Sequence, residues 1–122
     1  MGFYHSTRSA SPTFTSKEAI RRGIAPDGGL FVSDDLGGTT IDISTLASKD
    51  YPTLAREVMG ALLPDYSADE IAACVDEAYT GTFASSEVTP LVPLSQAPNA
   101  DGTPTYVMEL FGGPTSAFKD VA

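Results

Sequence analysis

Apolar residues recur with helical spacing in two neighbouring stretches of the chain. The first stretch follows Asp50, which can cap a helix that carries proline in its first turn, and it stops at Pro64. The second begins at Ser67 and Glu70, which form a capping-box pattern, and it stops at Gly81. The apolar positions are Leu54, Val58, Ala61 and Leu62 in the first stretch and Ile71, Cys74, Val75, Ala78 and Tyr79 in the second. Both stretches predict amphipathic helices that pack on each other or on a sheet.

Shorter elements are predicted on the N-terminal side of these two helices. Residues 3–8 alternate weakly between polar and apolar side chains, which predicts a short strand. Thr15 and Glu18 form another capping box, and Gly23 is suited to closing a helix. We therefore predict a helix over residues 16–23.

Turn-forming residues divide much of the remaining chain into short strands. A Pro-Asp-Gly-Gly turn within residues 25–29 precedes the apolar residues 30–32, a predicted buried strand, and the polar residues 33–40 predict a loop. Residues 90–94 and 105–110 predict the two strands of a β-hairpin. The prolines of the first of these strands lack a backbone donor, so we expect it at a sheet edge.

The final segment, residues 111–122, predicts a strand that runs through a Gly-Gly-Pro turn into a helix. Thr115 or Ser116 is expected to cap this helix, and Asp120 to support its N-terminus. Only about five helical residues follow the cap, too few for a helix that is stable in water. We therefore expect the sequence to be a fragment of a longer protein.

These elements together predict an α/β protein. Its N-terminal part is α+β-like, with short strands, two amphipathic helices and a hairpin. We predict one subdomain over residues 1–88 and the truncated start of a second domain over residues 89–122.

The charge of the chain narrows its possible partners. It carries 16 acidic and 7 basic side chains, a formal net charge of -9. Nucleic acids and anionic membranes need clustered basic residues, so neither is expected as a partner. No apolar run approaches the roughly 20 residues of a membrane helix. Cys74 is the only cysteine, which fits a reducing, cytoplasmic setting, and we expect it in the core and not in a metal site.

Lys119 is the candidate for catalysis. A helix N-terminus disfavours an ammonium, and Phe111, Phe118 and Val121 are expected to desolvate it. A neutral amine can attack an aldehyde to form a Schiff base. Spacing alone favours a solvated surface lysine over a catalytic one. It excludes a Walker phosphate loop, because Phe118 and Asp120 flank the lysine. His5, the sole histidine, shows no acid partner in the sequence and is given no role.

Three segments resemble threonine synthases. Glu109–Asp120 resembles the motif around the family's pyridoxal lysine, Gly23–Val32 resembles its Ala-Pro-Asp-Gly-Gly-Leu signature, and Tyr4 followed by residues 6–8 resembles its opening segment. The helix pair and the Pro-Leu-Val-Pro-Leu run lie between them in the expected order. One departure is Gly112, where many members carry a larger residue, often His.

This resemblance implies a pyridoxal 5'-phosphate (PLP) enzyme of the tryptophan-synthase-β-like fold, fold type II. Such enzymes convert O-phospho-L-homoserine and water to L-threonine and phosphate. By analogy, Lys119 forms the Schiff base and then serves as a general acid/base, and Phe118 packs beside the cofactor. Ser6, Thr7 and Arg8 are expected near the substrate, where Arg8 can pair with a phosphate or carboxylate.

In this family the loop that cradles the cofactor phosphate follows the lysine. We therefore expect the chain alone to be inactive and to bind PLP weakly. Two other functions stay open: a threonine synthase-like phospholyase, which releases phosphate and yields a 2-oxo acid, and a non-catalytic α/β interaction or lid domain. The oligomeric state is left open.

Overall fold

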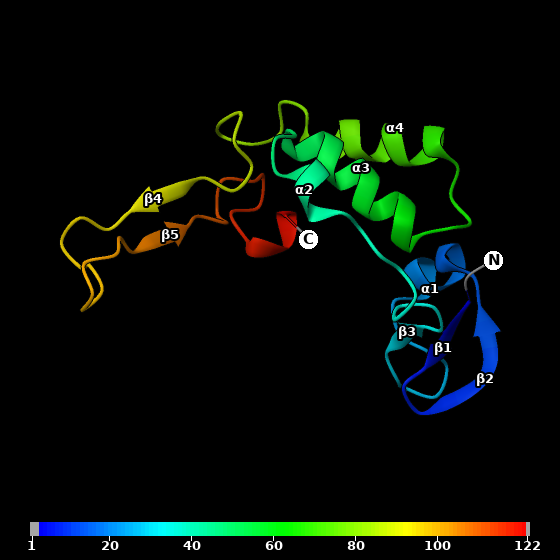
Figure 1. Cartoon of the computed structure of the whole chain (residues 1–122). Coiled ribbons are helices and arrows are strands. Elements are labelled where there is room, and N and C mark those ends of the chain that lie inside the picture. Colours follow the sequence, from blue (N-terminus) through cyan, green and yellow to red (C-terminus); the bar gives the residue numbers. More distant parts are fainter. Residues whose placement is uncertain (1–2, 122) are drawn as a thin grey trace. The chain divides into compact units, whose positions relative to one another are not determined.

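A three-stranded antiparallel sheet forms near the N-terminus in the computed structural model, which describes residues 3–121 (Figure 1). Its strand order is β2–β1–β3, with β1 at Tyr4–Ser6, β2 at Ser9–Phe14 and β3 at Phe31–Ser33. The predicted strands over residues 3–8 and 30–32 are confirmed with shifted ends. The expected burial of the second strand is wrong, since β3 is half-buried and Leu30 is 65% exposed. β2 was not predicted because its residues are exposed except for Phe14, so it lacks an apolar alternation.

Helix α1, Ser16–Arg22, follows β2 and confirms the prediction for this segment. The Thr15 hydroxyl accepts the Glu18 N–H at 3.2 Å, and the Glu18 carboxylate accepts the Thr15 N–H at 3.0 Å. This reciprocal pair is the capping box read from the sequence. Gly23 closes the helix with φ of 73°, a conformation that favours glycine.

The two predicted amphipathic helices are α3, Tyr51–Leu62, and α4, Ala68–Tyr79. The Asp50 carboxylate accepts the Thr53 N–H at 2.9 Å and caps α3 as expected. A further helix, α2 at Ile43–Leu46, was missed because four residues are too few to show a period. The loop predicted after β3 contains turns and no strand or helix.

The buried core of the N-terminal part is small. The rings of Phe14 and Phe31 meet edge to face at 5.1 Å. Ile71 and Val75 face inward from α4, and Val75 is completely buried. The prediction that Cys74 lies in the core is wrong: its side chain is exposed, because it lies beside the Ile71–Val75 stripe and not on it.

The predicted β-hairpin is confirmed, with strands shorter than expected. β4, Leu91–Pro93, pairs antiparallel with β5, Tyr106–Met108. Two more backbone hydrogen bonds flank the strands, from Leu94 N–H to Thr105 O and from Glu109 N–H to Pro90 O.

The chain divides into two compact units at Val75 and Asp76. The first contains the three-stranded sheet with α1, α2 and α3, and the second contains the hairpin and the lysine segment. The boundary predicted between residues 88 and 89 stays a prediction.

Candidate functional site

The first predicted site segment, Ser6–Thr7–Arg8, leaves β1 and meets the turn that follows α1. The Ser6 hydroxyl donates to Asp27 Oδ1 at 2.7 Å, and the Gly29 N–H donates to the same oxygen at 2.9 Å. These bonds, that from Ser6 first, lower the pKa of Asp27 below its ordinary value. Ser6 itself is buried.

Thr7 and Arg8 complete this cluster. Thr7 exchanges two hydrogen bonds with Leu30: its N–H donates to Leu30 O at 2.8 Å, and its hydroxyl accepts the Leu30 N–H at 3.0 Å. The Arg8 guanidinium donates to the Asp27 carbonyl at 2.8 Å. Two of the three segments that carry the resemblance therefore form one structural unit.

Arginine has five N–H donors, and the bond to the Asp27 carbonyl uses one of them. The guanidinium of Arg8 therefore has further N–H groups that can donate to a ligand. Arg8 is exposed, so these donors face solvent. An exposed guanidinium on a hydrogen-bonded turn is suited to an anion such as phosphate or carboxylate. The substrate-binding role of Ser6, Thr7 and Arg8 stays a prediction.

The second predicted site is the segment that carries Lys119. Here the prediction of a helix capped by Thr115 or Ser116 is wrong. A single 3₁₀ turn, η1 at Phe118–Asp120, follows Ala117, and no side chain caps it. Ser116 has φ of 57°, outside the extended conformation of a capping residue.

Asp120 organises this segment in place of a cap. Its carboxylate accepts the Thr115 N–H at 2.9 Å and the Thr115 hydroxyl at 2.6 Å. The hydroxyl of Thr115 lowers the pKa of Asp120, so the carboxylate is held charged. A Cβ at Gly113 would overlap the Asp120 side chain, which explains why glycine occupies this turn.

Lys119 is exposed on η1. The prediction that aromatic neighbours desolvate it is wrong in this structure, since Phe111 is 61% and Phe118 63% exposed. The side chain of Lys119 makes no hydrogen bond or ion pair with residues 3–121. Its amine is therefore accessible to a carbonyl compound, which is what attachment of PLP requires.

The chain has three lysines, and the other two are engaged. Lys17 forms an ion pair with Glu70 at 2.7 Å, and Lys49 forms one with Glu57. In residues 76–122 Lys119 is the only basic side chain. The acidic residues of the same stretch are Asp76, Glu77, Glu87, Asp101, Glu109 and Asp120.

A cavity of about 410 Å³ opens beside the start of the lysine segment. It is lined by Ala84, Ser85, Ser86, Glu87, Pro90, Glu109, Phe111 and Gly112. A Cβ at Gly112 would meet only the Phe83 ring, at 4.0 Å. The larger side chain common in threonine synthases therefore has room at its base in this chain.

Asp34 is a partner that the sequence did not reveal. It pairs with His5 Nδ1, because the pairing of β1 with β3 brings the end of β3 beside His5. Within the described part of the chain, no three His, Cys, Asp or Glu side chains gather as a metal site requires. None of the helices described there has the length and apolar character needed to cross a membrane.

Comparison with known proteins identifies the family of this chain. The family model described as "Threonine synthase N terminus" matches residues 3–79, well over half of the chain. The chain belongs to the threonine synthase family. The resemblance read from the sequence, and the α/β fold with it, are thereby confirmed.

Individual threonine synthases match along nearly the whole chain. The enzyme of Schizosaccharomyces pombe is 42% identical over 98% of the chain. The crystal structure of threonine synthase from yeast superposes with a TM-score of 0.80 at 36% identity over 97% of the chain. PLP-bound threonine synthase from Brucella melitensis superposes with a TM-score of 0.81 at 33% identity over 98% of the chain. The chain spans 22% to 25% of the length of these relatives.

Proposed function

We propose that the protein carrying this chain is a threonine synthase. It converts O-phospho-L-homoserine and water to L-threonine and phosphate, with PLP attached to Lys119. The observation that carries the proposal is Lys119 itself, which lies in the family's lysine motif and is the lysine without an ion-pair partner among the described residues.

The residues of this chain have distinct parts in the proposal. When bound, the cofactor supplies an electron sink for carbanions next to the substrate's amino group. The amine of Lys119 binds the cofactor and afterwards moves protons between substrate carbons. The bonds between Asp120 and Thr115 fix the backbone on both sides of Lys119. Phe118 packs beside the cofactor ring, and Arg8, with Ser6 and Thr7, binds an anionic group of the substrate.

Selective labelling tests the central step. The complete protein is incubated with PLP and reduced with borohydride, and the pyridoxyl adduct is located by peptide mass spectrometry. A protease that cuts after acidic residues is needed, because no Lys or Arg lies between Arg56 and Lys119. We expect the adduct on Lys119, with Lys17 and Lys49 as internal controls.

Substitution provides the matched control. Lys119→Arg keeps the charge but removes the nucleophilic amine, so the adduct should disappear and turnover should fall by about 10²–10⁴-fold or more. Adducts spread over several lysines, or none, would contradict the proposal and favour the interaction or lid domain.

The threonine synthase-like phospholyase stays as a second candidate, because it shares the cofactor and differs only in its product. Product analysis separates the two reactions: threonine supports the proposal, whereas a 2-oxo acid supports the phospholyase. The cytoplasmic location, and the inactivity of the 122-residue chain alone, remain predictions.

A further inference from the structure

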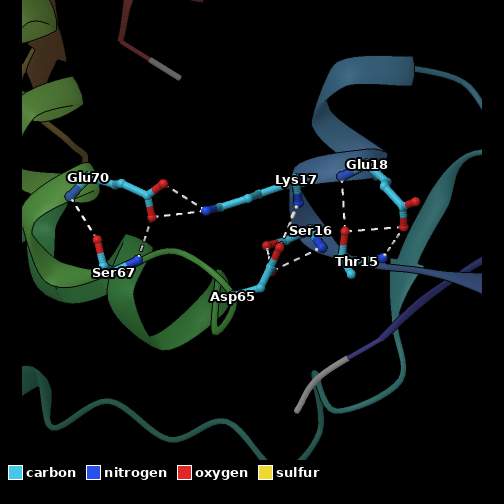
Figure 2. Close-up of polar contacts among 7 residues, drawn as sticks. All are labelled: Thr15, Ser16, Lys17, Glu18, Asp65, Ser67 and Glu70. Atoms are coloured by element: carbon cyan, nitrogen blue, oxygen red, sulfur yellow. Dashed lines mark hydrogen bonds and ion pairs between the residues drawn. The ribbon is translucent and has the colours of Figure 1, made fainter.

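Asp65 lies in the turn between α3 and α4 and binds the N-terminus of α1, as Figure 2 shows. Its carboxylate accepts the N–H groups of Ser16 and Lys17, each at 3.0 Å, and also the Ser16 hydroxyl. The first amides of a helix have no partner within the helix. Asp65 accepts hydrogen bonds from two of these amides, although it lies 48 and 49 residues further along the chain. Ser16, one of the two donors, is completely buried.

A second contact lies beside the first. The Lys17 ammonium bonds both oxygens of Glu70, at 2.7 and 2.9 Å, and lies 4.9 Å from the centre of the Tyr66 ring. Glu70 also accepts the Ser67 N–H at 2.8 Å as part of the α4 capping box. One carboxylate thus caps α4 and holds α1 (Figure 2).

The last residue of α3, next to this turn, contacts strand β1. The Tyr4 hydroxyl donates to the Leu62 carbonyl at 2.7 Å, three residues before Asp65. Tyr4 lies two residues before Ser6 on β1. The segment Leu62–Asp65 therefore fixes both β1 and α1, the two elements that lead into the Ser6–Asp27 cluster.

Helix α1 is short enough to transmit this constraint. Its seven residues span roughly 10 Å, because a helix rises about 1.5 Å per residue. Asp65 holds its first turn, and Gly23 at its other end leads into the buried Ala25. The backbone bonds between Ala25 and Gly29, and between Gly28 and Ala25, then build the turn that carries Asp27. A tilt of α1 at the Asp65 end would move this turn.

We propose that Asp65 is a positioning residue, which sets the place of Ser6, Thr7 and Arg8 through α1 and its following turn. Its effect on substrate rests on the proposed function, in which these three residues bind the substrate's anionic group. Asp65 itself touches neither substrate nor cofactor in this account.

Hydrogen exchange of the complete protein tests the positioning step without reference to activity. In Asp65→Ala the amides of Gly29 and Leu30, which bond Asp27 and Thr7, should exchange about tenfold faster, the size of effect that a lost cap produces. The amides of the β4–β5 hairpin should keep their rates. Asp69→Ala removes an exposed acid from the first turn of α4 and serves as the matched control.

Asp65→Asn is the milder variant, since it keeps the side-chain size and one acceptor if Asp65→Ala does not fold. Faster exchange at Gly29 and Leu30 in either variant, with Asp69→Ala unchanged, supports the proposal. Unchanged exchange at these amides in a folded variant overturns it.

Steady-state kinetics then test the link to the substrate. For Asp65→Asn we expect KM for O-phospho-L-homoserine to rise about tenfold, with kcat changed less than about twofold, as for a loss of uniform binding. Faster exchange with unchanged KM keeps Asp65 as the residue that sets this turn but removes Ser6, Thr7 and Arg8 from substrate binding. If the unsubstituted protein shows no PLP adduct at Lys119, the proposed function is refuted. The result of the hydrogen-exchange experiment is unaffected by that outcome.

Discussion

At Gly29 the backbone passes so close to Ser6 that a methyl group has no room. A Cβ built on Gly29 would overlap the Ser6 hydroxyl and come within 3.0 Å of the Thr7 hydroxyl. Both hydroxyls are already engaged, one with Asp27 and one with the Leu30 amide. The glycine is therefore required by the cluster and not by its own backbone conformation.

We expect Gly29→Ala to lower the free energy of unfolding by about 1–3 kcal/mol, the usual cost of overpacking. Urea denaturation measures this change. Gly37→Ala is the control, because nothing lies within 4 Å of a Cβ there, and it should change stability by less than about 0.5 kcal/mol. Equal effects of the two substitutions would show that the hydroxyls of Ser6 and Thr7 can move aside.

Individual side chains show where sequence reasoning reaches its limit. The segment Ser6–Arg8 was singled out by its resemblance to a family, but its partner Asp27 lies 21 residues from Ser6. Local patterns carry no information about such a pairing. The same holds for Asp65, whose bonds to α1 cross 48 and 49 residues. Cys74 was misplaced because helical spacing does not fix the width of the buried face.

At the scale of the element, α3 contains a glycine that its packing does not need. Gly60 is exposed within the helix, and nothing lies within 4 Å of a Cβ placed on it. Glycine in a helix costs conformational entropy relative to alanine. We expect Gly60→Ala to raise the free energy of unfolding by about 0.5–1 kcal/mol, measured by urea denaturation.

Gly23→Ala is the opposing control for this prediction. Nothing crowds a Cβ at Gly23 either, but its φ of 73° strains any residue with a side chain. We expect Gly23→Ala to lower the free energy of unfolding by about 1–2 kcal/mol. A gain in stability at Gly23, or a loss at Gly60, would contradict the assignment of these two backbone conformations.

The helices whose first turn follows a capping residue could be predicted from the sequence. Capping residues at Thr15, Asp50 and Ser67 marked α1, α3 and α4, and each of them makes the expected bond. β2 carries no such signal, because five of its six residues are exposed and pairing with β1 alone defines it. The helix expected after Thr115 does not form, because the Thr115 hydroxyl donates to the Asp120 carboxylate and does not cap a helix.

At the scale of the whole molecule, acidic pH should weaken the ion pair that joins Lys17 of α1 to Glu70 of α4. The bond from Lys17 holds the pKa of Glu70 at about 2, below its ordinary value of 4.5. Because the folded state binds this proton less readily, the stabilisation is fully present above about pH 5 and is lost as pH falls toward 2. The depressed pKa of Asp65 acts in the same direction.

Unfolding midpoints measured in urea between pH 7 and pH 2 test this dependence. Glu70→Gln should be less stable than the unsubstituted chain at pH 7, and the difference should shrink as pH falls from about 5 to 2. Asp69→Asn, which changes an acid with no bond to α1, should follow the unsubstituted curve. A difference that stays constant with pH would mean that Glu70 acts through packing and not through its charge.

The charge of the unit formed by residues 76–122 has a consequence for molecular encounters. This unit carries six carboxylates and one ammonium, so its long-range field repels anions. PLP and a phosphorylated amino acid each carry a doubly charged phosphate, which this field slows on approach. Apart from the Lys119 ammonium, attraction for that phosphate has to come from amide dipoles aimed at close range or from cations outside this unit.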